Sequence, residues 1–287
     1  MEFGPHEIPK DVEPLYAKRG NKILPTTDMC WVIKFMAPDE DANSQTNLEE
    51  LQNVLNLAIN PPRYCIEFPA DNWSLFGTNR AGVWYAMARY DGHVKWNTFC
   101  RANWRAIGES VLFFLEDLHI DHRAVHMDIK AENILVDYSK HRFVVADFEL
   151  MTPPDNIRLR AVTDDHYKWY YLGYGAELDQ PIKTWRTDLV MLGYLLARLT
   201  WNHEYNWTAQ ERCWQKERKP VTEADIRELL ILRDRQLQYG AASTVIEYLF
   251  KVSKMISWRL ESPPPRECYA VLRDILSGRL LAAEGQS

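Results

Sequence analysis

The chain has 287 residues and a formal net charge of −6, with 46% hydrophobic and 12% aromatic residues. This composition is typical of a folded domain with a large core, and it excludes an intrinsically disordered chain. The acidic balance argues against nucleic acid or an anionic membrane surface as a partner, and no apolar run reaches the roughly 18 residues that a membrane span needs.

The N-terminal part of the chain is predicted to be rich in strands, with one helix. Prolines in residues 1–28 exclude a long helix there. Residues 29–35 (MCWVIKF) are apolar and partly β-branched, which predicts a buried strand that carries Lys34. Residues 47–59 have apolar positions at helical spacing. Two further strands are predicted at residues 63–68 and 82–90.

After Asp91 and Gly92 the pattern becomes mainly helical. Residues 104–119 carry a helical apolar stripe, and two short strand-like runs follow at 133–138 and 143–148. Four more helices are predicted at residues 186–200, 222–238, 243–257 and 266–277. The sequence therefore predicts an α+β protein with a small β-rich lobe and a larger helical lobe.

A group of polar residues interrupts the apolar pattern in residues 125–136 (VHMDIKAENILV). It contains His126-Met127-Asp128, Lys130 and Asn133, and after an apolar hairpin the chain reads Asp147-Phe148-Glu149. One aspartate in such a pattern is a weak signal. The complete series, with a strand lysine upstream, is specific.

This order of motifs resembles the eukaryotic protein kinase family, whose catalytic loop reads H-R-D-L-x-x-x-N and precedes D-F-G. Residues 187–199 (TDLVMLGYLLARL) resemble the family's helix that begins with an aspartate and carries a glycine, with wording nearest to the casein kinase I and vaccinia-related kinase group. The resemblance covers nearly the whole chain. It implies a bilobal protein-kinase-like fold, with residues 1–91 as the N-lobe and residues 92–287 as the C-lobe.

The resemblance also implies catalytic and metal-binding roles. Asp128 would orient the substrate hydroxyl, and Lys130 would neutralise the γ-phosphate that is transferred. Asn133 and Asp147 would bind magnesium, a hard cation that prefers oxygen ligands. His126 is expected to be structural, packing in the loop and bonding to the backbone.

Nucleotide binding is expected at the strand lysine and at the link between the lobes. Lys34 would bind the α- and β-phosphates of ATP, and a glutamate of the 47–59 helix would hold it. We favour Glu50 over Glu49, because Glu50 lies at the edge of the apolar stripe. Adenine contacts are expected along residues 87–92, with the following residues as candidates: Met87, Ala88, Arg89 and Tyr90.

Three further residues are assigned structural roles by the resemblance. Asp188 begins the glycine-containing helix. Glu177 of Gly-Ala-Glu stands where the glutamate of A-P-E belongs, and Arg266 follows three prolines near the end of the domain. Glu177 and Arg266 are expected to form a buried ion pair.

The sequence departs from the family at three places. The glycine-rich phosphate loop is absent, although Lys18, Arg19 and Lys22 could contact phosphate in its place. Glu149 replaces the glycine of D-F-G, which removes a flexible hinge and adds negative charge. Met127 replaces the arginine of H-R-D, so activation by loop phosphorylation is not expected.

The implied activity is that of an atypical ATP-dependent serine/threonine protein kinase that uses Mg²⁺ and phosphorylates a protein substrate. Two alternatives stay open: a pseudokinase that acts as a binding or regulatory module, and a small-molecule phosphotransferase of the choline or aminoglycoside kinase type. The five scattered cysteines have no CxxC spacing, and the N-terminus lacks a secretory pattern. We therefore expect an intracellular protein, cytoplasmic or nuclear; the oligomeric state is not specified by the sequence.

Overall fold

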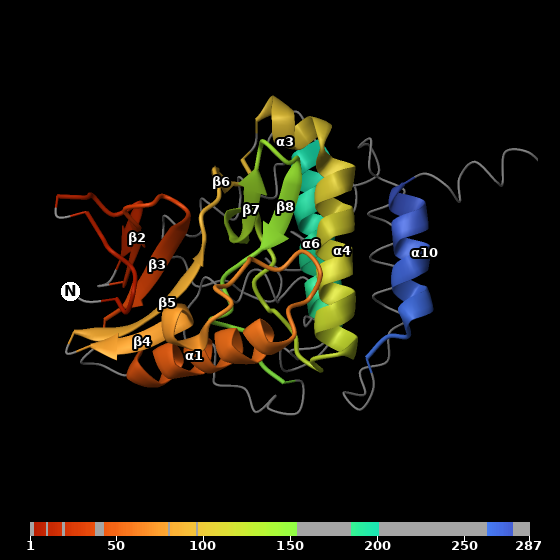
Figure 1. Ribbon diagram of the computed structural model, residues 1–287. Helices are drawn as coiled ribbons and strands as arrows, with labels where there is room; N and C mark the ends of the chain where they lie inside the picture. Colours follow the sequence, from red (N-terminus) through yellow and green to blue (C-terminus); the bar gives the residue numbers. More distant parts are fainter. Residues whose placement is uncertain are drawn as a thin grey trace, which may run out of the picture. The chain divides into compact units, whose positions relative to one another are not determined.

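An antiparallel five-stranded sheet and one long helix form the N-terminal part of the chain (Figure 1). The computed structural model describes residues 3–9, 11–18, 21–37, 43–79, 81–95, 97–153, 185–200 and 263–277. The strands, in the spatial order β1-β2-β3-β5-β4, are β1 (Tyr16–Lys18), β2 (Asn21–Pro25), β3 (Trp31–Met36), β5 (Gly82–Ala88) and β4 (Phe76–Asn79). The long helix is α1 (Asn43–Ile59), and the short helix α2 (Asn72–Leu75) precedes β4.

The two faces of this sheet are buried against different parts of the chain. On one face, Phe35 and Trp84 pack with Phe3, whose ring meets each of theirs edge-on at centroid distances of 6.0 and 5.9 Å. The neighbouring residues along each strand point to the other face of the sheet, because successive side chains alternate across a strand. Lys34 of β3 and Tyr85 of β5 are direct partners in the strand register and therefore share that second face.

The buried side of α1 contains one acidic residue. Leu51, Val54 and Leu57 are at most 7% exposed, and Glu50 is only 2% exposed. These positions recur at helical spacing, so they form one stripe. The helix contacts β5, and Glu50 is as deeply buried as the apolar residues of this stripe.

A second sheet is formed by β6 (Gly92–His93), β7 (Ile134–Asp137) and β8 (Arg142–Val145). Strands β7 and β8 are antiparallel, and the turn between them is stabilised by the Asp137 carboxylate, which accepts bonds from the Ser139 hydroxyl and the Lys140 amide. These bonds lower the pKa of Asp137 to about 2, with the Ser139 bond as the largest cause. The hairpin is therefore a well-defined local structure.

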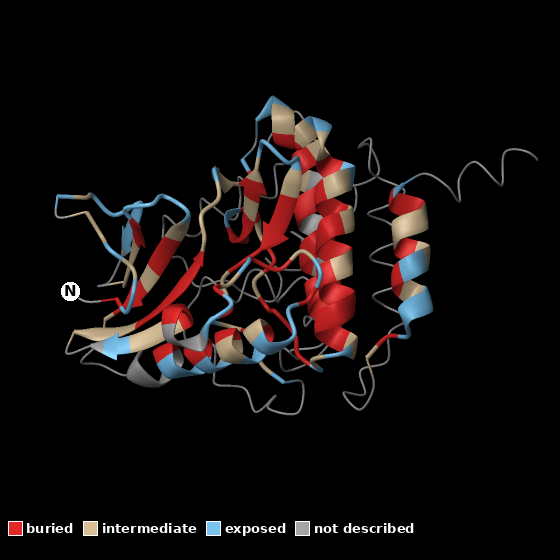
Figure 2. Ribbon diagram, in the orientation of Figure 1, coloured by how far each residue is buried: buried red, intermediate tan, exposed pale blue. Residues whose placement is uncertain are grey.

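The remaining described helices pack on one another. They are α3 (Thr98–Ala102), α4 (Trp104–Ile120), α6 (Trp185–Thr200) and α10 (Arg266–Leu276). Helix α4 contacts both α6 and α10, and most of its residues are buried (Figure 2). A Cβ at Gly108 would meet Leu276 at 2.8 Å and Leu196 at 3.1 Å, so glycine permits the close approach of the three helices.

The chain divides into two compact units. The first contains residues 1–93 and 133–151, and the second contains residues 94–132 and 152–287. The β7–β8 hairpin thus belongs with the N-terminal sheet unit. The division into lobes at residue 91 stays a prediction.

The predicted elements are mostly present, with one clear error. Segments 29–35, 82–90, 104–119 and 266–277 correspond to β3, β5, α4 and α10. Residues 63–68 do not form a strand: Cys65 makes an isolated bridge to Val145, and Tyr64 has a left-handed φ of 58° that interrupts extended structure. Strands β1, β2 and β4 were not predicted as strands, because their apolar alternation is short. The helices expected at 222–238 and 243–257 lie outside the described residues.

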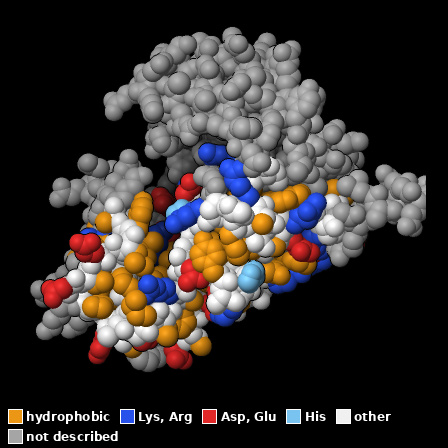
Figure 3. Space-filling model, turned by 90° about the horizontal axis from the view of Figure 1, so that it is seen from above, with side chains coloured by type: hydrophobic (Ala, Val, Ile, Leu, Met, Phe, Trp, Pro, Cys, Tyr) orange, Lys and Arg blue, Asp and Glu red, His pale blue; other side chains and the backbone are white. Residues whose placement is uncertain are grey.

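No one type of side chain dominates the described part of the face shown in Figure 3. Hydrophobic, acidic and basic side chains are interspersed among the residues that the structure describes there. Within the described part of the chain, no helix is long and apolar enough to cross a membrane.

Helix α10 is joined to α4 by arginines that pair with acidic residues. Arg273 bonds to Glu116 at 2.5 Å, and both side chains are largely buried, 13% and 5% exposed. Arg266 bonds to Asp121 at 2.6 Å and lies 3.4 Å from Glu116, but its side chain is 48% exposed. The expectation that Arg266 is buried is therefore wrong: at the start of α10 it reaches the exposed end of α4, and Arg273 occupies the buried position two turns later.

Replacing the two arginines should have unequal effects on stability. Arg273→Met is expected to cost about 3 kcal/mol, because it leaves Glu116 buried without its main partner; Arg266 still reaches Glu116, which limits the loss. Arg266→Met should cost about 0–1 kcal/mol, as for exposed pairs. Urea denaturation of both variants measures the difference. Equal losses would contradict this account of the interface.

Candidate functional site

The first group of site residues is centred on Lys34. Its ammonium bonds to Glu50 Oε1 at 2.6 Å and to Asp147 Oδ1 at 2.9 Å. Strand β3, helix α1 and the segment after β8 each supply one of the three residues. The predicted pair of Lys34 with Glu50 rather than the exposed Glu49 is confirmed.

Tyr85 completes the surroundings of Glu50. Its hydroxyl donates to Glu50 Oε1 at 2.9 Å, the same oxygen that accepts from Lys34. Burial raises the pKa of Tyr85 well above its ordinary value, so the hydroxyl stays a donor. Sequence reasoning missed this residue. The strand alternation could have indicated Tyr85, because Tyr85 is directly opposite Lys34 and its side chain is on the same face of the sheet.

Burial and charge act in opposite directions on this group. Burial alone would lower the pKa of Lys34, but the charges of Asp147 and Glu50 outweigh it and raise that pKa well above its ordinary value. Burial raises the pKa of Glu50, and the attraction of Lys34 offsets part of the rise. The lysine is therefore firmly charged, and the ionised state of Glu50 depends on it.

The β7–β8 hairpin brings Asn133 and Asp147 to the same end. Ile134 pairs with Val145 at the open end of the hairpin, and the Ala146 amide donates to the Asn133 carbonyl at 2.9 Å. The backbones of Asn133 and Ala146, which flank this pairing, are therefore close in space, and Asp147 follows Ala146 in the chain. Asn133 is only 5% exposed. Side-chain amide and carboxylate oxygens are suitable ligands for a hard cation.

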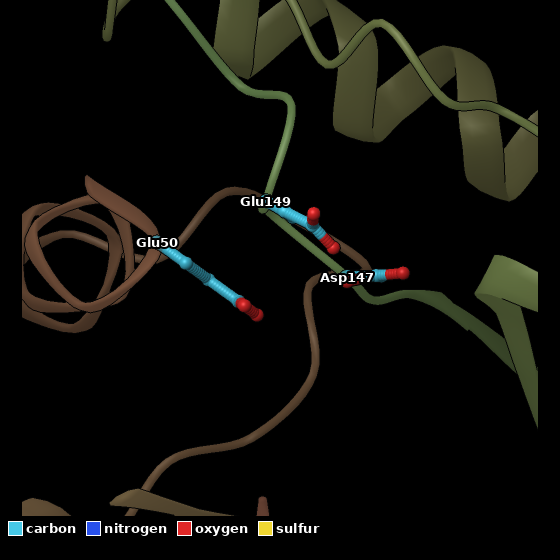
Figure 4. A group of neighbouring side chains, drawn as sticks. All are labelled: Glu50, Asp147 and Glu149. Carbon is cyan, nitrogen blue, oxygen red and sulfur yellow. The ribbon is translucent and has the colours of Figure 1, made fainter. Parts of the chain in front are cut away.

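Three carboxylates meet beside Lys34. Figure 4 shows Glu50 extending from α1 toward the segment that carries Asp147 and Glu149. One oxygen from each lies within 4.8 Å of the others. The three acids carry a formal charge of −3 against the single positive charge of Lys34. Glu149 therefore adds its charge at the Lys34 group itself.

The second group contains Asp128 and Lys130. Lys130 Nζ lies 2.5 Å from Asp128 Oδ2, with the side chains 32% and 14% exposed. His126 is fully buried, packs edge-on against Phe114, and its Nδ1 accepts from the Asp128 amide at 3.2 Å. The structural role predicted for His126 is confirmed.

Asp188 organises the backbone of this loop. Its buried carboxylate accepts from the amides of His126 and Met127 at 2.7 and 2.8 Å. It also bonds to His119 Nε2 at 2.9 Å, and His119 Nδ1 lies 2.5 Å from the Tyr269 hydroxyl. Burial raises the pKa of Tyr269 well above its ordinary value, which keeps that hydroxyl a donor. Sequence reasoning identified Asp188 but missed His119 and Tyr269, which lie within apolar helical stripes.

Backbone strain coincides with the two motifs. Met127 and Asp147 have left-handed φ values of 68° and 67°, whereas Glu149 does not have a positive φ. Such conformations cost about 1–3 kcal/mol and persist where surrounding contacts impose them, often at functional sites. The two amide bonds to Asp188 impose it at Met127. Glu149 therefore does not adopt a conformation that requires glycine.

The segment expected to contact adenine is largely occupied by internal bonds. The amides of Ala88, Arg89 and Asp91 donate to the carbonyls of Glu67, Cys30 and Val136, respectively. The Tyr90 hydroxyl accepts from the Glu67 amide at 3.1 Å, and burial raises the pKa of Tyr90 to about 12. Among amides 88–91, only that of Tyr90 has no acceptor in the described part of the chain.

Two of the cations proposed to replace the glycine-rich loop, Lys18 and Lys22, are on different faces of the sheet. Lys22 pairs with Phe35 in the register and so lies on the face opposite to Lys34. It therefore points away from any phosphate that Lys34 would bind. Lys18 pairs with Asn21 at the end of the β1–β2 ladder, on the face of Lys34 by the same parity, and Arg19 lies outside the described residues.

The predicted site residues therefore fall into two groups, each within one compact unit. The first unit contains Lys34, Glu50, Met87, Ala88, Arg89, Tyr90, Asn133 and Asp147, and the second contains His126, Asp128, Lys130, Asp188 and Arg266. Glu177 lies outside the described residues, so its pairing with Arg266 stays a prediction. No protein-family model matches the chain, and no curated protein matches it.

Lys34→Met should destabilise the protein in a pH-dependent way. At pH 7 the expected cost is about 3–5 kcal/mol, because Glu50 stays buried without its ammonium partner. The folded pKa of Glu50 is raised above the unfolded value of about 4.3, so its contribution to stability is lost as the pH rises through the folded pKa. Without Lys34 the pKa rises further, and the cost of the variant should shrink as the pH is lowered from 7 to 5.

Urea denaturation between pH 5 and 8 measures this dependence. Lys34→Met/Glu50→Gln is the matched control, because it has no carboxylate to titrate at this position and should show a flatter profile. A cost of Lys34→Met that is the same at pH 5 and pH 8 would show that Glu50 is not the responsible group.

Proposed function

We propose that this chain is an ATP-dependent phosphotransferase of the protein kinase type that phosphorylates serine or threonine in a protein, on a bilobal kinase-like α+β fold. The contact of Lys34 with both Glu50 and Asp147 carries the proposal. A kinase site requires a lysine on the third strand that pairs with a glutamate of the following helix, together with the aspartate of D-F-G. Here the lysine lies on β3, the glutamate on α1, and the aspartate in Asp-Phe-Glu.

The donor set suits the groups that this reaction needs. Asn133 and Asp147 would hold magnesium through oxygen, and Lys34 would hold the phosphates. When bound, ATP supplies the phosphoryl group and magnesium neutralises its charge. Asp128 would accept the hydrogen bond of the attacking hydroxyl, and the Lys130 ammonium beside it would offset negative charge. Held by Asp188, the loop keeps Asp128 in a defined position.

Two measurements separate this proposal from its alternatives. Mg·ATP should raise the melting temperature by mass action, and ATP with EDTA should raise it less. Labelled phosphate should then pass to casein or to the chain itself. Binding without transfer would favour a pseudokinase, and transfer only to choline or an aminoglycoside would favour a small-molecule phosphotransferase. Absence of both binding and transfer would refute nucleotide chemistry.

Asp128→Asn should lower the rate of phosphate transfer by about 10²- to 10⁴-fold, the usual contribution of a positioned general base. Asparagine has nearly the same shape, so the circular dichroism spectrum and Mg·ATP binding should be retained. Transfer assays and thermal melts with and without Mg·ATP test both parts. Turnover near that of the wild type would remove Asp128 from the mechanism.

The Tyr90 amide is predicted to donate to the adenine ring. Tyr90→Pro removes this N–H, and nucleotide affinity should fall about 2- to 10-fold, as expected for one hydrogen bond. Tyr90→Phe is the matched control: it keeps the amide and loses the bond between the hydroxyl and the Glu67 amide. Titration calorimetry with ADP compares the two variants. Equal affinities for ADP would place adenine elsewhere.

A further inference from the structure

The turn that carries Asp147 is fixed to α1 by one side chain. The Asn53 amide nitrogen Nδ2 donates to the carbonyls of Phe148 and Met151, each at 2.9 Å. An amide nitrogen has two hydrogens, so each bond uses one of them. The Met151 amide also donates to the Phe148 carbonyl at 3.2 Å, which closes the turn. Asn53 therefore bridges both ends of the turn.

Asn53 lies on the same side of α1 as Glu50. The two residues are three positions apart, so they are neighbours on the helix surface. Glu50 holds Lys34, which contacts Asp147, while Asn53 holds the backbone that follows Asp147. Adjacent positions of one helix thus fix the side chain and the main chain of the same motif.

Two features of the motif require such a restraint. Asp147 is in the left-handed conformation, which persists where contacts impose it. The carboxylates of Glu50, Asp147 and Glu149 approach within 4.8 Å, and their repulsion favours movement of the turn away from α1. The neutral amide of Asn53 opposes this movement without adding charge, and burial of the Phe148 side chain acts in the same direction.

We propose that Asn53 is a positioning residue that clamps the 147–151 turn to α1 and thereby holds Asp147 against Lys34. The consequence for metal and nucleotide binding rests on the proposed function, whereas the clamp itself does not. Because Glu149 replaces the hinge glycine, the clamp makes α1 and the motif move as one body. Ordering Asp147 with magnesium would then also order α1.

Hydrogen exchange tests the clamp without any ligand. Asn53→Leu removes both donors, and Asn53→Asp keeps the shape but replaces the donors with acceptors. In both variants the Met151 amide should lose protection by about 10-fold or more, as local opening becomes easier. Asn56→Leu is the matched control on the exposed side of α1, where the Asn56 side chain accepts a bond from Gln52. Unchanged protection in both Asn53 variants would refute the clamp.

Magnesium dependence tests the consequence for the site. In Asn53→Leu, the magnesium concentration that gives half of the ATP-dependent thermal shift should rise about 10- to 100-fold, as for residues that orient metal ligands. The shift with ATP and EDTA should not change, and Asn56→Leu should behave as the wild type. If the wild type shows no magnesium-dependent shift, the proposed function fails, while the exchange measurement still decides whether Asn53 clamps the turn.

Discussion

The buried carboxylate of Glu50 is the constraint on which the N-terminal unit depends. A charge that is 2% exposed is costly unless it is paired, and here Lys34 and Tyr85 converge on one of its oxygens. To make this contact, β3 and β5 must pair in a register that sets Lys34 opposite Tyr85, and α1 must turn Glu50 inward. A one-residue shift of either strand would place the lysine or the tyrosine on the other face of the sheet.

The motif after β8 adds a second constraint to the same point. Asp147 reaches Lys34 from a left-handed backbone conformation, and Asn53 holds the turn that follows. A structure that served stability alone would gain little from gathering three carboxylates around one lysine. Strained backbone and shifted pKa values cluster at functional sites, and both occur here around Lys34. Backbone strain and charge repulsion at one place therefore mark the first group as a candidate functional site.

In the second unit, the buried carboxylate of Asp188 has the same stabilising role as that of Glu50 in the first unit. Three donors converge on its buried carboxylate, two of them backbone amides of the loop that carries Asp128. The bonds to His119 and Tyr269 extend this network to α4, which directly precedes the loop, and to α10, which is distant in sequence. Met127 fits this arrangement as a buried apolar residue.

The sequence by itself determined the four long described helices, strands β3, β5, β7 and β8, and the order of the motifs. It also pointed to the following residues as candidates: Lys34, Glu50, Asp128, Asn133, Asp147 and Asp188. The helices and strands follow from local periodicity, whereas the candidate residues follow from the resemblance of the motifs to the protein kinase family. Only the tertiary structure decided that 63–68 is not a strand, that Arg273 rather than Arg266 is the buried partner of Glu116, and that Lys22 lies on the face away from Lys34. It also revealed Tyr85 and Asn53, because a hydrogen bond across a register or from a helix to a distant turn depends on how elements pack, and no local pattern contains that information.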